Sequence, residues 1–188
     1  MKEPILEPLL RLMRTKQVLP YLRQYPNCRL LDIGCGWEAK LLRAVAPHIH
    51  SGIGVDFKAT LIKSEKIETQ SLTLQDKLPF KDASFDFITM LAVLEHLEND
   101  YLILEECARL LVPGGGLLIT VPSRYAKHVL EFLAYKLRLI NSDEIRDHKR
   151  YYNKQDVVSL VERVHGLNLQ EHVYFQLGFN NRIFIKAT

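Results

Sequence analysis

The sequence has few cysteines, and their spacing is typical neither of a disulfide framework nor of a metal site. Its 188 residues include three cysteines, no two of which form a CxxC pair: Cys28, Cys35 and Cys107. Such an odd-numbered set suits reduced thiols in a cytosol better than a disulfide framework. We therefore expect no disulfide and no bound metal.

Long hydrophobic runs are also missing. The first 20 residues interrupt their leucines with charged side chains, namely Lys2, Glu3, Glu7, Arg11, Arg14 and Lys16. They lack the continuous apolar core of a signal peptide. No stretch approaches the roughly 18 apolar residues of a membrane-spanning helix. The sequence thus predicts a cytoplasmic protein that is not processed.

A strong charge of one sign is a third feature that the sequence lacks. The formal net charge is +3, which is no clear signal for nucleic-acid binding unless the charge gathers on one face. The hydrophobic fraction of 47% and the charged fraction of 25% are typical of a soluble globular protein. No internal repeat or flexible linker divides the chain, so we predict a single domain over residues 1–188.

Short apolar runs alternate with longer amphipathic stretches along the chain. The runs predict strands at residues 29–33, 52–57, 71–74, 85–90, 116–121, 169–175 and 182–186. Helical spacing of apolar residues predicts helices at residues 5–22, 39–45, 59–65, 100–111, 125–140 and 154–165. Asn153 is the expected N-cap of the last helix.

This alternation predicts the fold class. Parallel neighbouring strands need a crossover connection, so alternating strands and helices indicate βαβ units. Residues 176–181 leave room only for a tight turn, which makes the last two strands an antiparallel hairpin. The expected fold is α/β, a doubly wound, mostly parallel seven-stranded sheet with a C-terminal antiparallel hairpin. Its ligand should bind beyond the carboxyl ends of the strands.

A glycine-rich turn follows the first predicted strand. Gly34, Cys35 and Gly36 lead into a predicted helix, and glycines at such a turn let a ligand approach the backbone. The pattern G-x-G-x-x-A is also a dinucleotide-binding fingerprint, so the glycines by themselves do not choose a cofactor. A tight turn without any ligand is the structural alternative.

Two acidic residues bear on the choice of cofactor. Asp32, at the end of the first predicted strand, would repel a pyrophosphate but attract the ammonium group of S-adenosylmethionine. Asp56 follows Gly36 by 20 residues, the spacing at which an acid reaches ribose hydroxyls. The structural alternatives are a loop-ordering hydrogen bond for Asp32 and a helix cap for Asp56. S-adenosylmethionine is the favoured cofactor.

The sequence resembles the class I S-adenosylmethionine-dependent methyltransferases from about Arg29 onward. Five segments carry the resemblance in the family's order: 31–36 (LDIGCG), 54–56 (GVD), 78–86 (LPF and SFD), 94–97 (LEHL) and 110–116 (LLVPGGG). The resemblance implies that S-adenosylmethionine is the cofactor. It further implies cofactor contacts from Asp32, Gly34, Cys35, Gly36, Asp56, Phe57, Gln75 and Leu91.

The chain departs from this family at two positions. Glu38 stands where the first motif often has a third glycine. Leu74 stands where the family often has an acid that meets the adenine amino group, so Gln75 or Asp76 would have to replace that contact.

Two histidines are candidates for catalysis. Methyl transfer is a displacement at a carbon that the sulfonium already activates, so a protein base is needed only when the acceptor must lose a proton. His96 follows the fourth predicted strand, and His148 lies in a charged segment, 143–152, that borders the acceptor pocket in similar proteins. The alternatives are a packing histidine for His96 and a solvated loop for His148, with Tyr151 and Tyr152 as anchors.

The acceptor itself is left open by the sequence. Residues 1–25 form an expected N-terminal helical cap, and residues 122–153 an acceptor-side insertion. Within the insertion, Ala126, Leu130, Leu133, Leu137 and Ile140 share one helical face, which indicates a core face, a lid over an apolar acceptor or a membrane-surface helix. A small-molecule or lipid-like acceptor, including a sugar intermediate, fits, with peripheral membrane contact as a further expectation. The oligomeric state is open.

Two other functions agree with part of the sequence. An NAD(P)-dependent oxidoreductase would explain G-x-G-x-x-A, but Asp32 opposes it, and the chain has little room for a separate substrate domain. A non-catalytic cofactor-binding module would explain the departures at Glu38 and Leu74. We expect an enzyme of the methyltransferase class.

Overall fold

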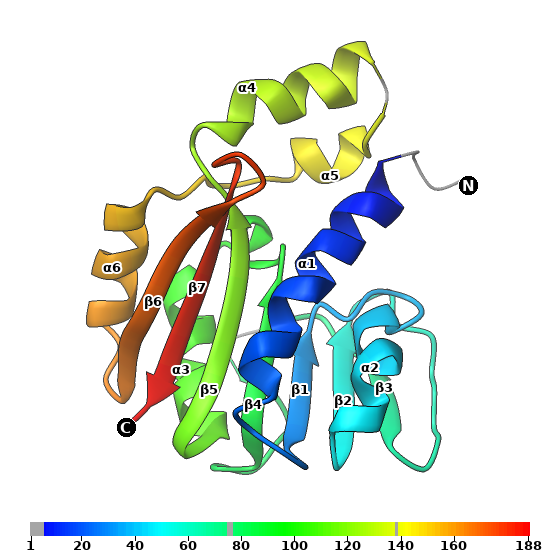
Figure 1. Cartoon of the computed structure of the whole chain (residues 1–188), viewed down its shortest axis with the longest axis vertical. Coiled ribbons are helices and arrows are strands. Elements are labelled where there is room, and N and C mark those ends of the chain that lie inside the picture. The colour runs from blue at the N-terminus through cyan, green and yellow to red at the C-terminus, as the bar shows by residue number, and fades with distance from the viewer. Residues whose placement is uncertain (1–5, 75–76, 138) are drawn as a thin grey trace.

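A computed structural model describes residues 6–74, 77–137 and 139–188, and a seven-stranded sheet forms its centre (Figure 1). The strand order is β3-β2-β1-β4-β5-β7-β6, with β7 antiparallel to both of its neighbours. The strands are β1 (Arg29–Ile33), β2 (Ser51–Asp56), β3 (Ile67–Ser71), β4 (Phe85–Leu91), β5 (Leu111–Pro122), β6 (Leu167–Phe175) and β7 (Asn180–Ala187). The predicted fold class, with its terminal hairpin, is confirmed.

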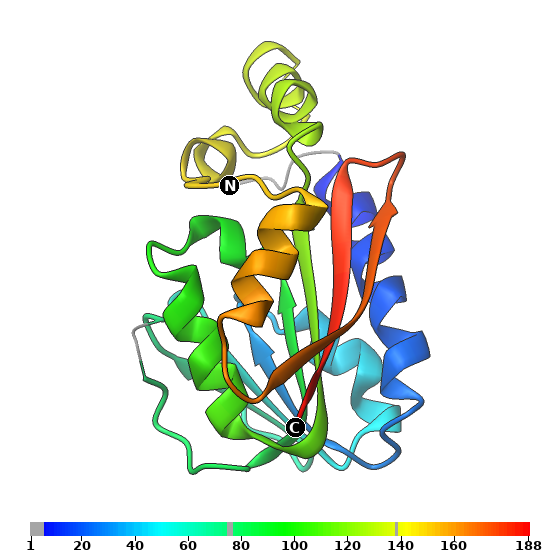
Figure 2. The ribbon, with the colours of Figure 1, turned by 90° about the vertical axis from the view of Figure 1, so that its left-hand side faces the viewer.

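The helices cover both faces of the sheet. They are α1 (Glu7–Leu22), α2 (Lys40–Val45), α3 (Asp100–Leu110), α4 (Ala126–Glu131), α5 (Ser142–Arg146) and α6 (Lys154–Glu162), with 3-10 turns at Ala46–His48 and Leu94–His96 and a π-helical turn at Phe132–Lys136. Figure 2 shows α1 and α2 on one side of the sheet and α3 and α6 on the other. Asn153 caps α6 as expected, in a reciprocal pair of hydrogen bonds with Asp156.

Two hydrophobic cores follow from the alternation of side chains along the strands. Leu30 and Phe87 face the core beneath α1 and α2, whereas Leu31 and Ile88 face the core beneath α3 and α6. All four side chains are fully buried. Because successive strand residues point to opposite faces, a strand covered on both sides is apolar throughout.

The connection between β2 and β3 corrects one prediction. Residues 59–65 were expected to form a helix, but they run beside β3 without one, and Lys63 forms a bridge with Glu68. The Thr69 hydroxyl donates to the Thr60 carbonyl at 2.6 Å and accepts from the Ile62 amide at 2.6 Å. These bonds satisfy backbone groups that a helix would otherwise pair internally, and β3 begins four residues earlier than predicted.

The helix predicted at residues 125–140 is divided in the structure. It consists of α4 and the π-helical turn, and α5 follows as a separate short helix. Together these segments lie beyond the carboxyl ends of β1, β4 and β5 (Figure 1). Among the described residues, no helix has the length and apolar character needed to cross a bilayer.

Candidate functional site

The glycine turn lies between β1 and α2 at the carboxyl edge of the sheet. Gly34 has a φ of +81°, and a Cβ placed on it would lie 2.1 Å from Cγ2 of Val93, so only glycine fits this contact. Gly36 has a φ of +67°, and nothing lies within 4 Å of the place where its Cβ would be. The first glycine therefore permits close packing, and the second leaves bare backbone open to a ligand.

Cys35 contributes backbone rather than a side chain to this turn. Its residue is 9% exposed, and a Cβ placed on Gly54 would approach its Sγ to 2.8 Å. Burial raises the pKa of the thiol to about 12, with help from the charges of Asp32 and Asp56. The thiol thus stays protonated and fills the core, and only the peptide group of Cys35 can meet a cofactor.

Asp32 is a buried carboxyl group beneath the turn. The residue is 3% exposed, and its Oδ1 accepts a hydrogen bond of 2.7 Å from the Thr89 hydroxyl on β4. Burial raises its pKa to about 7, and the negative charge of Asp56 adds to that rise, whereas the Thr89 hydroxyl lowers it. A cation beside Asp32 would lower this pKa again, so the position favours a positively charged ligand group.

Asp56 orders the same turn from the end of β2. Its Oδ2 accepts from the Gly36 amide at 3.0 Å, and its Oδ1 accepts from the Lys58 amide at 2.8 Å. Each carboxylate oxygen has a second lone pair, so these bonds leave acceptor capacity for a ligand hydroxyl. The neighbouring Phe57 ring is 64% exposed and thus presents an apolar face beside the carboxylate.

A cavity lies past the end of β3. This cavity of about 680 Å³ is lined by Ser71, Leu72, Thr73, Lys77, Leu78, Pro79 and Phe80. Leu74 packs against the core, and Leu91 at the end of β4 is half-buried. Gln75 and Asp76, on which the adenine contact was expected to depend, lie outside the described residues.

The structure brings His96 and His148 together. Their ring centroids are 4.8 Å apart, and Nδ1 of His96 lies 3.0 Å from Oδ2 of Asp147. Burial lowers the pKa of His148 to about 4, and the nearby His96 lowers it further, so its imidazole is neutral at ordinary pH. The Lys149 amide donates to the carbonyl of Glu95 at 2.7 Å, which holds the two histidine segments side by side.

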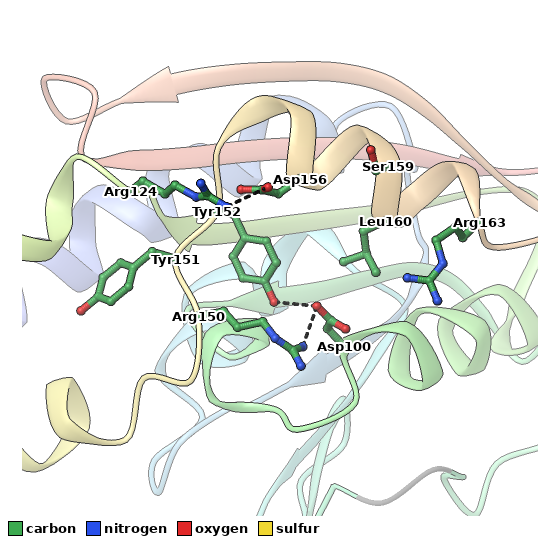
Figure 3. A pocket seen from close by; sticks show the side chains of 9 residues that line it. All are labelled: Asp100, Arg124, Arg150, Tyr151, Tyr152, Asp156, Ser159, Leu160 and Arg163. Carbon is green, nitrogen blue, oxygen red and sulfur yellow. Dashed lines mark hydrogen bonds and ion pairs between the residues drawn. The ribbon is translucent and has the colours of Figure 1, made fainter.

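Tyrosines and arginines form a further cavity next to the histidines. Figure 3 shows this hollow of about 500 Å³, lined by Asp100, Arg124, Arg150, Tyr151, Tyr152, Asp156, Ser159, Leu160 and Arg163. Tyr152 is an anchor, since it is 3% exposed and its hydroxyl donates to Oδ2 of Asp100 at 3.0 Å. The Tyr151 ring lies 5.3 Å from the ring of His148, so it joins the cavity to the histidine pair.

The amphipathic stretch after β5 has apolar residues on two faces. Of the predicted core stripe, Ala126 and Ile140 are buried, Leu130 and Leu133 are half-buried, and Leu137 is 48% exposed. Sequence periodicity missed an outer stripe of exposed apolar side chains on the same stretch. We call these four residues the outer stripe: Tyr125, Val129, Phe132 and Tyr135.

Comparison with known proteins bears on this site. Residues 31–119 match the model of a methyltransferase domain family. A Mycobacterium tuberculosis protein, "Probable S-adenosylmethionine-dependent methyltransferase", is 33% identical over 121 residues, which are 59% of this chain and 42% of that protein. Residues 31–119 thus form a methyltransferase domain, and the chain is similar to the class I S-adenosylmethionine-dependent methyltransferases. S-adenosylmethionine is the cofactor of these methyltransferases.

Two further relatives set the extent of the similarity. A ubiquinone biosynthesis O-methyltransferase of Coxiella burnetii is 33% identical over 138 residues, which are 68% of this methyltransferase chain and 56% of the relative. The chain thus spans about half the length of the curated relatives that it matches. A chain from the solved complex of the Haloferax volcanii Trm112 methyltransferase activator with a protein assigned as a methyltransferase shares the fold. Its TM-score is 0.70 at 16% identity, over 100% of this chain and 99% of that one.

Several polar residues of this candidate site were not singled out from the sequence, namely Thr89, Glu95 and Asp147. Glu95 stands in the LEHL segment that resembles the family, and Asp147 stands in the charged segment 143–152. Thr89 had no such signal, because its partner Asp32 lies on another strand.

Proposed function

We propose that this chain transfers the methyl group of S-adenosylmethionine to a small molecule or to a lipid or sugar intermediate. The observation that supports the cofactor site is the buried Asp32 beneath the open backbone of Gly36, with Asp56 beside it. An ammonium group near Asp32 and ribose hydroxyls near Asp56 would satisfy both carboxylates. When bound, the cofactor supplies a methyl group on a positively charged sulfur, so the protein chiefly aligns the acceptor and excludes water.

The remaining cofactor contacts belong to this proposal. Gly34, Cys35 and Gly36 would offer backbone to the methionine part, and Phe57 and Leu91 would offer apolar surface to the nucleoside. Gln75 remains a prediction for the adenine contact.

The acceptor would lie beneath α4 and α5, with α1 beside it. Segment 94–96 begins next to Val93, whose side chain contacts the glycine turn, so His96 and His148 lie beside the cofactor edge. The neutral imidazole of His148 would receive a proton from an acceptor hydroxyl or amine, with His96 beside it. Tyr151 would then form part of the pocket wall.

A binding experiment separates this function from the nicotinamide alternative. Calorimetric titration of the chain with S-adenosylmethionine and, in parallel, with NADH should show uptake of the former only. Uptake of NADH alone would contradict the proposal. Transfer of tritium from methyl-labelled S-adenosylmethionine to a panel of phenols, sugars and quinone precursors would then identify the acceptor. Cofactor uptake without transfer to any acceptor would favour a non-catalytic binding module.

The outer stripe supports peripheral contact with an anionic membrane. Its side chains are 73%, 36%, 54% and 45% exposed in chain order, and the exposed Lys127 and Lys136 lie on the same stretch. Aromatic rings with flanking cations are typical of helices that lie on anionic bilayers. The similarity to a ubiquinone biosynthesis enzyme also favours a lipid-like acceptor.

Vesicle binding tests this contact. Sedimentation with phosphatidylserine-containing vesicles should recover the chain, and Phe132→Ser with Tyr135→Ser should release it. Leu61→Ser is the matched control, because Leu61 is 78% exposed but lies between β2 and β3. Equal binding of both variants would contradict the membrane contact.

A further inference from the structure

Three metal-ligating side chains meet at the acceptor edge of the sheet. One ligand atom from each of Glu95, His96 and His148 lies within 4.8 Å of the other two. We propose that these three residues bind a divalent transition-metal ion, a site that the cysteine pattern of the sequence did not predict.

The fold makes this cluster from two distant segments. Glu95 and His96 lie in the short 3-10 turn after β4, and His148 follows α5. Besides the Lys149 amide, the Arg150 guanidinium ties the segments together, because it donates to the carbonyl of Glu98 at 2.9 Å and pairs with Asp100 at 2.8 Å. The two segments that carry the cluster are therefore held together by contacts of the neighbouring residues Lys149 and Arg150.

His96 has a carboxylate partner of the kind that metal-binding histidines have. Its Nδ1 lies 3.0 Å from Oδ2 of Asp147, and because an ionised carboxylate only accepts, Nδ1 is the donor and Nε2 is the nitrogen that could bind an ion. Histidines that bind metals commonly donate their other ring nitrogen to a carboxylate in this way, and this bond fixes the tautomer and the ring orientation. Asp147 is thus a positioning residue for the site.

His148 supplies a second, independent observation. Its Nδ1 is buried and has no hydrogen-bond partner among the described residues of the chain. Burying an imidazole nitrogen without a partner is costly, and coordination of a cation would remove that cost.

The donor set indicates which ions would bind. Glu95, which is 1% exposed, brings a buried carboxylate to two imidazole nitrogens. Two nitrogens and one oxygen suit zinc, cobalt, iron or manganese rather than magnesium or calcium, which prefer oxygen ligands. Three protein ligands also leave coordination positions open, as in catalytic rather than structural zinc sites.

A metal ion here would rest on the proposed function and deepen it, and with the ion bound the imidazoles of His96 and His148 would be ligands rather than bases. Positioned near Val93 and the glycine turn, the ion would bind the oxygen of an acceptor hydroxyl and ease the loss of its proton to water. That oxygen would take the methyl group as the C–S bond breaks and the sulfonium becomes a neutral thioether. The acceptor class would accordingly be a hydroxyl compound.

Cobalt and zinc titrations of the untagged full-length chain test the site. Co²⁺ should bind with a stoichiometry of one and give visible absorption bands, and Zn²⁺ should displace it. Asp147→Asn should weaken binding about 10–100-fold, as expected for an outer-sphere partner. His148→Ala and the near-isosteric Glu95→Gln should weaken it at least as much, whereas the exposed His165→Ala should not.

Outcomes of this titration are independent of methyl transfer, because neither cofactor nor acceptor is present. Circular dichroism and urea denaturation of each variant serve as the check on its fold. Equal Co²⁺ affinity in His148→Ala, or an equal loss in His165→Ala, would show adventitious binding and overturn the site. Metal uptake by a chain that fails to bind S-adenosylmethionine would instead contradict the proposed function alone.

Discussion

The cofactor edge and the acceptor side of this chain are built in different ways. At the cofactor edge, backbone amides make several of the contacts: the Gly34 amide donates to the carbonyl of Val55 at 2.8 Å, and the Gly36 amide donates to Asp56 at 3.0 Å. On the acceptor side, His96 meets Asp147, and Tyr152 meets Asp100, through side chains some fifty residues apart. Backbone bonds between parallel strands tolerate many sequences, whereas these side-chain contacts depend on particular residues.

The family match follows the same division. It covers residues 31–119 and ends before the insertion at 122–153 begins. The part that it covers contains the glycine turn, Asp32 and Asp56, so cofactor binding is the property shared with relatives. The outer stripe and His148 lie beyond it, and they are the features from which an individual acceptor would have to be inferred.

The largest effect is expected from Asp32→Asn at the cofactor edge. The amide keeps the shape of the side chain but removes the charge that we assign to the ammonium group of the cofactor. Charged hydrogen bonds contribute about 1.5–3 kcal/mol, so the Kd for S-adenosylmethionine should rise about 10–100-fold in calorimetry. Asp143→Asn, whose side chain is 81% exposed on the acceptor side, is the control and should bind normally. If both variants bound S-adenosylmethionine equally well, cofactor binding could not be assigned to the edge that contains Asp32.

Gly34→Ala should destabilise the fold more than the same change at Gly114. Both glycines have a φ near +80°, so both substitutions add similar backbone strain. Only at Gly34 does the new Cβ meet Val93, and overpacking of this kind costs about 1–3 kcal/mol. Urea denaturation measures the difference. Equal losses of unfolding free energy in the two variants would mean that close packing of Gly34 against Val93 does not matter for stability.

Cofactor binding should depend on pH through Asp32. With a pKa of about 7, this carboxyl group is mostly protonated at pH 6, so the affinity there should be about fivefold to tenfold lower than at pH 7.5. Thr89 and Asp56 are the groups that face it, and Asp32→Asn should flatten the profile. A profile unchanged by that substitution would assign the titration to another group.

The raised pKa of Asp32 also makes the stability of the free chain depend on pH, but in the opposite direction: stability falls as the pH rises. Below the unfolded-state pKa of Asp32, near 4, both states bind the proton, and above it only the folded state retains it. The resulting contribution to folding is lost as the pH rises from about 4 through about 7. Asp32→Asn should therefore remove this decline in urea denaturation.

The smallest effect is expected from Tyr152→Phe on the acceptor side. Loss of the hydroxyl removes its bond to Asp100 and should cost about 1 kcal/mol of unfolding free energy. Because Tyr152 lies outside the cofactor edge, the affinity for S-adenosylmethionine should not change. Tyr174→Phe is the matched control, since that hydroxyl accepts from the Lys154 amide at 3.1 Å but the residue is 39% exposed, so it should cost less. A matching fall in cofactor affinity would show that the two regions are coupled.

Much of the fold could be predicted from hydrophobic periodicity, because the pattern that marks a buried strand or an amphipathic helix lies within that segment of the sequence. β1 was predicted to its last residue, and the C-terminal hairpin followed from the short turn before β7. Residues 59–65 are the exception: their amphipathic spacing is that of a helix, but hydrogen bonds to Thr69 hold them along β3. Local pattern cannot reveal a partner that lies on a neighbouring strand.

The sequence by itself determined the α/β fold class, the glycine turn and the two acids beside it, because each depends on the pattern or spacing of residues along the chain. Only the tertiary structure decided the burial that raises the pKa of Asp32, the exposure of the outer stripe, and the meeting of Glu95, His96 and His148. Burial and proximity are properties of segments that fold against one another, and no single segment contains them.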